Sequence, residues 1–320
     1  MESSKKKKLN IAFWGSAKIA VPLFCALERH QEISIKCAVT QPDKKANKNI
    51  LTESPIKREA KSLGIPVLQP TSLSDKNFYQ TFLDADISLC VLFAYGSIIP
   101  ALLLDTPPLG WVNVHPSLLP AYRGASPIQW AIKNNDSLTG ISLIQMDDGI
   151  DTGPLIAQWK LFIEKSETYE TVSKKIALEA SQRIPETIVA LANGKIEPHD
   201  QSEEGKSTTR RLKKEDGNID WLKSAEEIER QIRAYNPWPG THSIFLGERI
   251  KILSSKVLPH ASRANETPGT TRLRGNNLIV CCGENTELQI LSMQRAGKKI
   301  QAAEEFIRGF PVIAHGQFDL

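Results

Sequence analysis

The chain has 320 residues, of which 41% are hydrophobic and 24% charged, a composition typical of a globular protein and long enough for two domains. No apolar run approaches the roughly 20 residues of a membrane helix, and the lysine-rich start has no apolar segment of signal-peptide length behind it, so we expect a cytoplasmic protein with no membrane partner. The net charge of +4 is modest, so charge alone does not identify a partner.

The first half of the chain alternates strands with helices. An apolar strand at 9–14 leads through a glycine into a helix at about 17–29, and strands are expected at 33–39 and 64–68. The segment 86–94 is almost entirely apolar, which suits a central strand buried on both faces. The other expected elements are helices near 54–63 and 75–83, strands at 109–114, 140–146 and 155–163, and a long helix at 169–193. This alternation predicts a doubly wound, Rossmann-like α/β sheet.

The turn after the first strand argues against a nucleotide-binding dehydrogenase. It contains a single glycine, Gly15, whereas dinucleotide-binding folds use Gly-x-Gly-x-x-Gly at this place. The chain also lacks the Gly-x-x-x-x-Gly-Lys-Ser/Thr pattern of a P-loop. A Rossmann-like sheet without a phosphate-binding loop indicates a different ligand.

The cysteines give no sign of a metal site. None of them forms a Cys-x-x-Cys pair, and no histidine spacing completes a zinc site. The five residues are Cys25, Cys37, Cys90, Cys281 and Cys282. Their pattern fits a reducing cytoplasm, and we expect no metal in this protein.

A polar stretch, Glu197 to Thr209, follows the long helix and indicates a linker. We expect residues 1–196 to form a catalytic domain, 197–216 the linker and 217–320 a second domain. The second domain is expected to contain a helix at 224–235 and short β runs at 243–246, 249–257, 277–282 and 287–293. Several short strands with turn signals suggest a small β-barrel.

Charge is unevenly placed along the chain. From Lys206 to Leu320 there are 18 Lys and Arg against 13 Asp and Glu, a balance of +5, which leaves −1 for residues 1–205. A basic second half suggests an anionic partner that is held mainly by that half.

Three polar residues stand where chemistry could occur. Asn113 and His115 end the apolar strand at 109–114, and because side chains two apart on a strand share a face, they should project together. Asp151 lies in a glycine-flanked loop that is flexible enough to approach this strand end. Each residue alone is more simply a turn, cap or core residue. Their combination predicts a site at the carboxyl edge of the sheet, where open α/β sheets bind ligands.

Two motifs extend this site: Asn-x-His-x-Ser-Leu-Leu-Pro-x-Tyr-Arg-Gly over residues 113–124 and Asp-x-Gly-x-Asp-Thr-Gly over 147–153. Together they resemble the folate-dependent formyltransferases. Further matching segments are Gln41–Asp43, Ser54–Lys57, Gly64–Pro70, Ala94–Pro100, Ala125–Gln129 and Thr139–Gly140, and later in the chain Ile219–Trp221 and Arg230–Gly240. The resemblance covers nearly the whole chain, and the later segments mark the family member that acts on tRNA.

The resemblance implies a Rossmann-like formyltransferase domain followed by an OB-fold-like domain, a shape suited to nucleic-acid surfaces. It implies transfer of a formyl group from 10-formyltetrahydrofolate to the amino group of initiator methionyl-tRNA, for translation initiation. We expect the enzyme to act as a monomer.

Formyl transfer to an amine passes through a tetrahedral oxyanion. Asn113 can donate its amide to that oxygen, and His115 can donate to the same oxygen if the imidazole is protonated. A neighbouring Asp151 would favour the protonated imidazole and could relay the amine's proton. The resemblance assigns the segment Ser117, Leu118, Leu119 and Pro120 to the folate pocket rather than to nucleophilic catalysis.

Residues that could contact tRNA are basic and lie in two places besides Arg123 in the first motif. Lys44, Lys45 and Lys48 occupy a loop where the tRNA enzymes carry an insertion with arginines. Lysine supplies charge to a phosphate but no bidentate fork, and the loop read alone is a solvated turn. Arg210, Arg211 and Lys213 stand at the domain junction, where they could contact phosphates or simply belong to a solvated linker.

Two other functions compete with this one. A formyltransferase acting on a small amine would share the chemistry, but the long basic second domain and the Asn-Pro-Trp-Pro motif at 236–239 argue against it. A non-catalytic RNA-binding protein on a formyltransferase-derived scaffold would not need Asn113, His115 and Asp151. The salt dependence of turnover distinguishes the two kinds of substrate. Turnover of tRNA should weaken steeply as the salt concentration rises, while turnover of a small uncharged amine should be insensitive to salt.

Overall fold

The computed structural model describes residues 8–45, 51–259 and 266–320. The chain divides into two compact units. The first unit consists of the chain up to Gly124, Leu138–Phe162 and Ser173–Thr208. The second unit consists of Ala125–Ser137, Ile163–Val172 and Thr209–Leu320. The second unit therefore takes two short segments from the first half of the sequence.

A seven-stranded sheet forms the centre of the first unit. In sheet order its strands are β10 (Leu155–Phe162), β9 (Leu138–Gln145), β7 (Trp111–His115), β6 (Leu89–Leu92), β1 (Leu9–Trp14), β2 (Ile33–Val39) and β5 (Val67–Leu68). From β7 to β5 all neighbouring strands are parallel, whereas β9 runs antiparallel to β7 and β10 runs antiparallel to β9. The strands that follow one another in the chain lie on both sides of β1, which is the predicted doubly wound arrangement.

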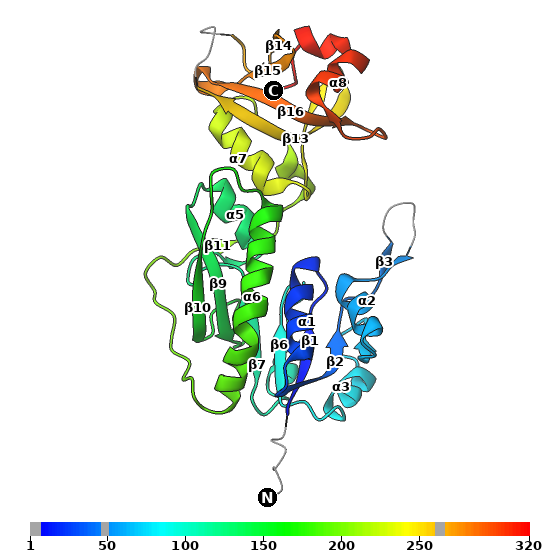
Figure 1. Cartoon of the computed structure of the whole chain (residues 1–320), viewed down its shortest axis with the longest axis vertical. Coiled ribbons are helices and arrows are strands. Elements are labelled where there is room, and N and C mark those ends of the chain that lie inside the picture. Colours follow the sequence, from blue (N-terminus) through cyan, green and yellow to red (C-terminus); the bar gives the residue numbers. More distant parts are fainter. Residues whose placement is uncertain (1–7, 46–50, 260–265) are drawn as a thin grey trace, which may run out of the picture. The chain divides into compact units, whose positions relative to one another are not determined.

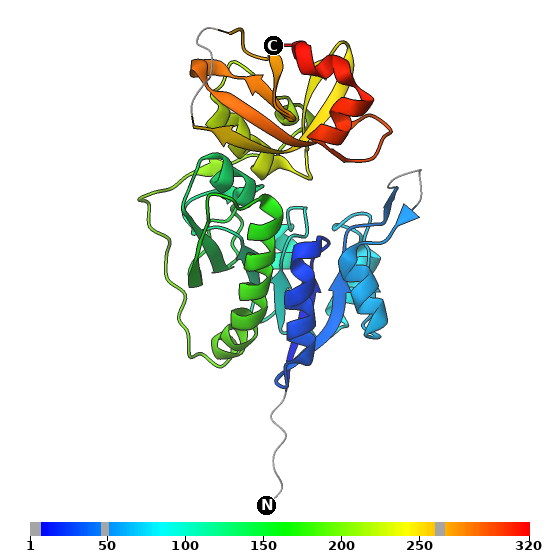
Figure 2. The ribbon, with the colours of Figure 1, turned by 45° about the horizontal axis from the view of Figure 1, so that its top comes forward.

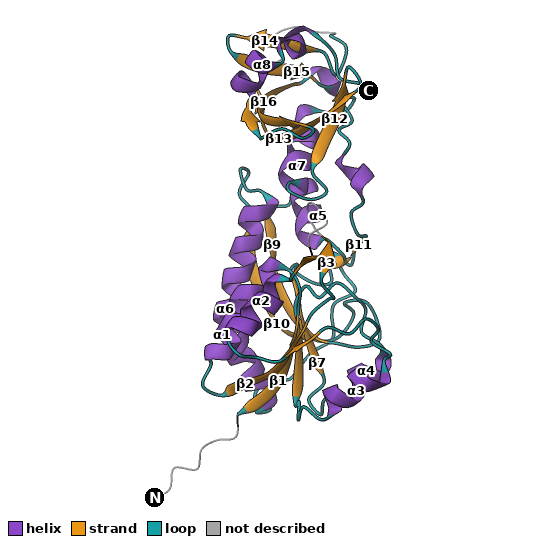
Figure 3. Ribbon diagram, turned by 90° about the vertical axis from the view of Figure 1, so that its right-hand side faces the viewer, coloured by secondary structure: helices purple, strands orange, loops and turns teal. Residues whose placement is uncertain are grey.

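Helices cover both faces of this sheet. Figure 3 shows α1 and α6 on one face and α3 and α4 on the other. The helices are α1 (Val21–Arg29), α2 (Pro55–Ser62), α3 (Lys76–Leu83), α4 (Ala101–Leu104) and α6 (Tyr169–Ala192). Ser54 and Asp75 begin α2 and α3 because their side chains accept the free backbone N–H groups of the first turns. Two small pairs of strands complete the set: β3 (Lys44–Lys45) with β4 (Leu51–Thr52), and β8 (Arg123–Gly124) with β11 (Thr208–Thr209).

Aromatic side chains fill the core between the sheet and α3. Trp14 on β1 lies 5.9 Å from Phe78, 5.7 Å from Phe82, 5.1 Å from Tyr95 and 4.8 Å from Trp111, measured between ring centroids. These are edge-on or tilted arrangements, which aromatic rings prefer. The packing holds β1, β6 and β7 at fixed positions relative to one another, and the predicted site is at the end of β7.

An antiparallel sheet forms the second unit. Its strands are β12 (Thr241–Phe245), β13 (Glu248–Leu258), β16 (Glu287–Arg295), β15 (Asn277–Cys281) and β14 (Thr271–Arg274) in sheet order, with β17 (Gln301–Ala302) paired to β16. Its helices are α5 (Pro127–Lys133), α7 (Ala225–Tyr235) and α8 (Ala303–Gly309). Figure 2 shows α8, in red, beside the yellow and orange strands. Ser224 and Glu227 form a capping box that begins α7 where the sequence predicts it.

The structure confirms the two fold classes and corrects several element boundaries. The predicted strand 86–94 is shorter, at Leu89–Leu92, and the predicted helix at 17–29 starts with a 3₁₀ turn, Lys18–Ala20, before α1. The sequence analysis missed β14, β17 and α8 entirely. An antiparallel β unit is present as expected, while its closure into an OB-type barrel stays a prediction.

Within the described part of the chain, no helix combines the length and the apolarity that crossing a membrane requires (Figure 1).

The aromatic core makes a prediction about stability. Phe82 is 1% exposed and contacts three aromatic rings, so Phe82→Ala should lower the free energy of unfolding by about 3–5 kcal/mol. Phe162, in the same unit, is 70% exposed, and Phe162→Ala should change the free energy of unfolding by less than about 0.5 kcal/mol. Urea titration of both variants measures the difference. Equal losses would mean that this cluster is not the stabilising core of the unit.

Candidate active site

The carboxyl end of β7 brings two of the predicted residues together. Asn113 and His115 are two residues apart on this strand and therefore project from the same face. The neighbouring strand β9 is antiparallel and pairs Asn113 with Ile144 and His115 with Ser142. Because β7 is held between β6 and β9, the backbone that carries both side chains is fixed by hydrogen bonds on each side. His115 is 4% exposed.

The third residue, Asp151, lies in the loop between β9 and β10. Its φ of 54° is in the left-handed region, which aspartate tolerates better than most residues. Two glycines allow the loop to close tightly. A Cβ at Gly153 would lie 1.8 Å from the backbone oxygen of Gln145, and one at Gly149 would lie 2.0 Å from the Thr152 hydroxyl. The glycine-rich sequence is thus required by close backbone approach as well as by flexibility.

The Asp151 carboxylate joins the two segments. Its Oδ1 accepts a hydrogen bond from Asn113 Nδ2 at 2.9 Å, and its Oδ2 accepts one from the Gly124 backbone N–H at 2.8 Å. His115 Nδ1 lies 3.4 Å from the same Oδ2, and the Asp151 side chain is 13% exposed. The structure therefore brings the three predicted residues, Asn113, His115 and Asp151, into one cluster.

Both ring nitrogens of His115 face hydrogen-bond acceptors. Nε2 lies 2.9 Å from the carbonyl oxygen of Tyr122, and Nδ1 faces the Asp151 carboxylate. A carbonyl and a carboxylate can only accept, so either ring nitrogen that carries a hydrogen has a partner to which it can donate. The Tyr122 contact orients the ring, which leaves Nδ1 as the nitrogen directed toward Asp151.

Asn113 has a donor to spare. Its amide nitrogen carries two hydrogens, and Asp151 takes one of them. The second amide hydrogen of Asn113 and Nδ1 of His115 are thus two donors at the strand end that could converge on one developing negative charge. Such a pair suits the oxyanion of an acyl transfer.

Sequence reasoning missed one residue that holds the site together. The Gln201 amide nitrogen donates to the backbone oxygens of Asp151, at 2.9 Å, and Gly153, at 2.8 Å. Its carbonyl oxygen accepts two bonds from Arg123, at 3.0 Å from Nε and 2.6 Å from a terminal guanidinium nitrogen. Gln201 lies in the predicted linker, 50 positions after Asp151, and no sequence pattern indicates this contact.

Arg123 has a different environment from the one predicted. It was expected among the residues that contact tRNA, but it is 5% exposed and its guanidinium is directed at Gln201. A buried guanidinium with internal partners is not accessible to a phosphate backbone. Arg123 is therefore placed to hold the Asp151 loop through Gln201.

The predicted folate segment forms a buried turn. Ser117 is 1% exposed and its hydroxyl donates to the Ala121 carbonyl, while Leu119 is 3% exposed and its N–H donates to Ser142 Oγ at 2.9 Å. Leu118 and Pro120 are half-buried. The turn is thus anchored to β9, and only Leu118 and Pro120 have surface that a ligand could reach.

The basic loop after β2 is described in part. Lys44 is exposed and begins β3. Lys45 completes this strand, and Lys48 falls outside the described residues.

At the chain segment that opens the second unit, Arg210, Arg211 and Lys213 are exposed. The Arg210 guanidinium makes two hydrogen bonds to Asp216, at 2.7 and 2.5 Å, and lies over the Trp130 ring with 5.7 Å to its centroid. The hydrogen bonds from Arg210 lower the pKa of Asp216 to about 2. Arg210 therefore makes structural contacts within the second unit, although its side chain is exposed.

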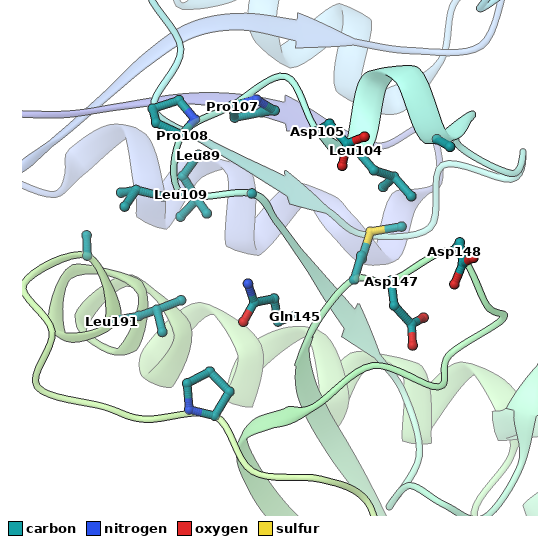
Figure 4. A pocket seen from close by; sticks show the side chains of 15 residues that line it. Leu89, Leu104, Asp105, Pro107, Pro108, Leu109, Gln145, Asp147, Asp148 and Leu191 are labelled. Atoms are coloured by element: carbon teal, nitrogen blue, oxygen red, sulfur yellow. The ribbon is translucent and has the colours of Figure 1, made fainter.

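A cavity of about 730 Å³ opens beside the Asp151 loop in the first unit. Its lining includes Gln145, Met146, Asp147 and Asp148, which lead from β9 directly into that loop. Figure 4 shows Gln145 and Leu191 on one side and Leu104 and Asp105 on the other, near the end of α4. Other lining residues are Leu89, Ala101, Pro107, Pro108, Leu109, Gly110, Ala192 and Pro198. Its size is in the range of small-molecule sites, and its wall mixes aliphatic surface with a few polar groups.

Among the residues that the structure describes, no group of three or more His, Cys, Asp or Glu side chains could hold a metal ion, and the five cysteines are free thiols.

Comparison with known proteins identifies relatives along the whole chain. The formyl transferase family matches residues 7–188, and the formyl transferase C-terminal domain family matches residues 211–311. The methionyl-tRNA formyltransferase of Thermodesulfovibrio yellowstonii is 39% identical over 301 residues, which cover 93% of this chain and 95% of the relative. The enzymes of the same name from Myxococcus xanthus and Geobacillus thermodenitrificans are 38% and 37% identical, with 93% and 94% of this chain covered and 94% of each relative.

Solved structures share the fold at lower identity. The sugar 3N-formyl transferase WlaRD superposes with a TM-score of 0.63 at 20% identity, over 92% of this chain and all of that chain. HypX from Aquifex aeolicus in complex with tetrahydrofolic acid gives 0.61 at 14% identity, over 94% of this chain and 47% of that one. These likenesses support the architecture described above.

Gln201 makes the site's rigidity testable. Gln201→Leu removes its two hydrogen bonds to the Asp151 loop, each worth about 0.5–1.5 kcal/mol, so backbone amides of residues 147–153 should exchange with deuterium on the order of ten- to 100-fold faster. Gln80→Leu, on the exposed face of α3, is the matched control and should leave that segment unchanged. Unaltered exchange in Gln201→Leu would show that Gln201 does not hold the loop.

Proposed function

The chain belongs to the methionyl-tRNA formyltransferases, and from that premise we propose that it transfers the formyl group of 10-formyltetrahydrofolate to the amino group of initiator methionyl-tRNA. The observation that carries this proposal is the Asp151 carboxylate, which Asn113 and Gly124 bind and which His115 faces. A carboxylate, an imidazole and an amide in one cluster match the three tasks of acyl transfer to an amine. These tasks are stabilising an oxyanion, removing a proton from the amine and returning a proton to the leaving nitrogen.

In the first step the amine nitrogen attacks the formyl carbon, and the carbonyl electron pair moves to oxygen. Asn113 stabilises that oxyanion with the amide hydrogen that Asp151 does not take. His115 Nδ1 lies 3.4 Å from Asp151, longer than a strong hydrogen bond, so its hydrogen can turn to the same oxygen as the charge develops. The Tyr122 carbonyl holds the ring through Nε2. Both donors are held on β7 before the reaction begins, so little reorganisation is needed when the charge develops.

In the second step the oxyanion collapses and the bond between the formyl carbon and the folate nitrogen breaks. Asp151 accepts the proton that the attacking amine releases, directly or through a water, and returns that proton to the leaving folate nitrogen by the same route. The carboxylate can serve this role because it is 13% exposed and lies at the strand end rather than in the core. No covalent intermediate on the protein is required.

For the formyl donor we propose the cavity of about 730 Å³ that adjoins the Asp151 loop. Met146, Asp147 and Asp148 lie both in its wall and in the segment that leads to Asp151, so a ligand there would reach toward the catalytic cluster. Leu118 and Pro120 are the members of the predicted folate segment that we propose as further contacts. Ser117 and Leu119 act by holding the turn.

For the tRNA we propose contacts with exposed lysines and arginines. Lys44, Arg211 and Lys213 have exposed side chains that could approach phosphates, and Lys45 and Lys48 belong to the same predicted set. Arg210 could stack and bind at once, since its guanidinium already lies over Trp130. Arg123 is not among the proposed contacts because it is buried.

The cellular setting follows from the reaction. We propose that the enzyme works as a monomer in the cytoplasm. Five free thiols are compatible with a reducing compartment, and the catalytic cluster is assembled from residues of a single chain.

The direct test is transfer of labelled formyl from 10-formyltetrahydrofolate to initiator methionyl-tRNA. Wild-type protein should transfer the label, and His115→Ala should lower the rate on the order of 100–1,000-fold because one oxyanion donor is lost. His30→Ala is the matched control, since His30 precedes β2 at the opposite edge of the sheet and pairs with Glu186. It should keep the wild-type rate.

A wild-type protein that binds the folate but leaves the tRNA unlabelled would contradict the proposal. That result would favour the alternative of a formyltransferase acting on a small amine.

A further inference from the structure

A second cavity, of about 340 Å³, lies in the first unit and has no part in the chemistry described above. Its wall consists of Gln41, Pro42, Asp43, Lys44, Pro70, Thr71, Leu73, Tyr95 and Ser97. These residues follow the carboxyl ends of three parallel strands, β2, β5 and β6. The cavity therefore opens on the same edge of the sheet as Asn113 and His115.

The sheet order fixes the path between the cavity and the catalytic cluster. From β7 the parallel strands run in the order β6, β1, β2, β5, and neighbouring strands are about 4.8 Å apart. The wall of the cavity is thus offset from β7 by roughly 5 to 19 Å along the edge. On the other side of β7, β9 runs antiparallel to it, and the carboxyl end at this edge belongs to β10, the outermost strand of the sheet. A long acceptor whose amine lies at Asp151 and that follows this edge passes over the cavity.

Hydrogen bonds hold the wall of this cavity in place. The Gln41 backbone N–H donates to Ser16 Oγ at 2.9 Å, and its side chain donates to Ser97 Oγ at 3.0 Å. Gln69 Nε2 donates to the Gln41 carbonyl at 2.9 Å and to Asp43 Oδ1 at 2.8 Å. Because the polar wall is already ordered, a ligand would lose less conformational entropy on binding.

The charges of the cavity select the chemistry of its occupant. Asp43 is the one carboxylate of the wall, and Lys57 binds it at 2.6 Å. This contact holds the pKa of Asp43 below its usual range, so the carboxylate stays ionised and paired. A carboxylate in the wall disfavours a phosphate inside the cavity. The exposed Lys44, by contrast, offers a cation at its margin.

The remaining wall is neutral and of two kinds. Gln41, Thr71 and Ser97 offer hydrogen-bond donors and acceptors, whereas Pro42, Pro70 and Leu73 offer apolar surface, and Tyr95 is 2% exposed. Burial raises the pKa of Tyr95 to about 12, so its hydroxyl is neutral at physiological pH. Neutral hydrogen-bonding edges beside flat apolar faces are what proteins present to unpaired bases and riboses.

We propose that this cavity binds an unpaired nucleotide of the tRNA's 3′ end, with the base and ribose inside and the phosphate beside Lys44. The inference rests on the proposed function, because it needs an acceptor that continues from the formylated amine into single-stranded nucleic acid. It adds a specificity site that a small-amine substrate would leave empty.

The test fills the cavity and leaves the catalytic cluster intact. Thr71→Trp introduces a large side chain at an exposed wall position, and Thr81→Trp makes the same change on the exposed face of α3, away from the cavity. In Thr71→Trp the KM for initiator methionyl-tRNA should rise about tenfold or more, as expected from loss of one base contact, with kcat and the KM for 10-formyltetrahydrofolate unchanged. Thr81→Trp should behave as wild type in all three constants.

A second cavity variant, unfolding temperatures and a competing trinucleotide distinguish loss of the binding site from misfolding. Ser97→Phe fills the cavity from another exposed wall position and should raise the same KM, and unfolding temperatures establish that each variant is folded. The trinucleotide CpCpA should inhibit wild type and Thr81→Trp but not Thr71→Trp. Active wild type with unchanged KM in both cavity variants would overturn this inference alone. Wild type that does not formylate the tRNA would overturn the proposed function and this inference with it.

Discussion

The site depends on one carboxylate. Asp151 accepts hydrogen bonds from the Asn113 side chain at 2.9 Å and from the Gly124 backbone N–H at 2.8 Å, which precede it by 38 and 27 positions in the chain. The same carboxylate lies 3.4 Å from His115 Nδ1. Without this carboxylate, the Asn113 amide and the Gly124 N–H would lose the acceptor that they share. The positions of Asn113, Gly124 and His115 around the site therefore depend on one group.

Much of the surrounding structure serves to hold that carboxylate. The left-handed backbone at Asp151 is less favourable than an extended one, and it persists because Gly149 and Gly153 permit close approach and Gln201 binds the loop from outside. Arg123 in turn orients Gln201. Deeper in the unit, the aromatic cluster around Trp14 fixes β7 relative to β1 and β6. These contacts restrict the movement of the Asp151 loop and of β7, and an oxyanion site requires donors that are fixed before the reaction.

The sequence predicted the parts of this fold that follow from local periodicity. Strand and helix alternation gave the doubly wound sheet, and the two-residue spacing of Asn113 and His115 put both on one face. Contacts between distant polar groups could not be predicted, since the bonds from Gln201 to the Asp151 loop leave no pattern in the chain. Strand β14 was missed because Arg272 and Arg274 look solvated in the sequence, whereas both bind Glu287, which is 1% exposed. Tertiary pairing decides such positions, and local propensity does not.

The measurement that tests the central claim most directly is a double-mutant cycle on formyl transfer. It compares single-turnover rates of wild type, His115→Ala, Asp151→Asn and the combined variant with initiator methionyl-tRNA. If Asp151 acts largely by controlling His115, the second substitution should cost little beyond the first, because residues that act as a unit are strongly non-additive. Losses that multiply would show that the two residues act independently, which would contradict the account of one carboxylate organising the site.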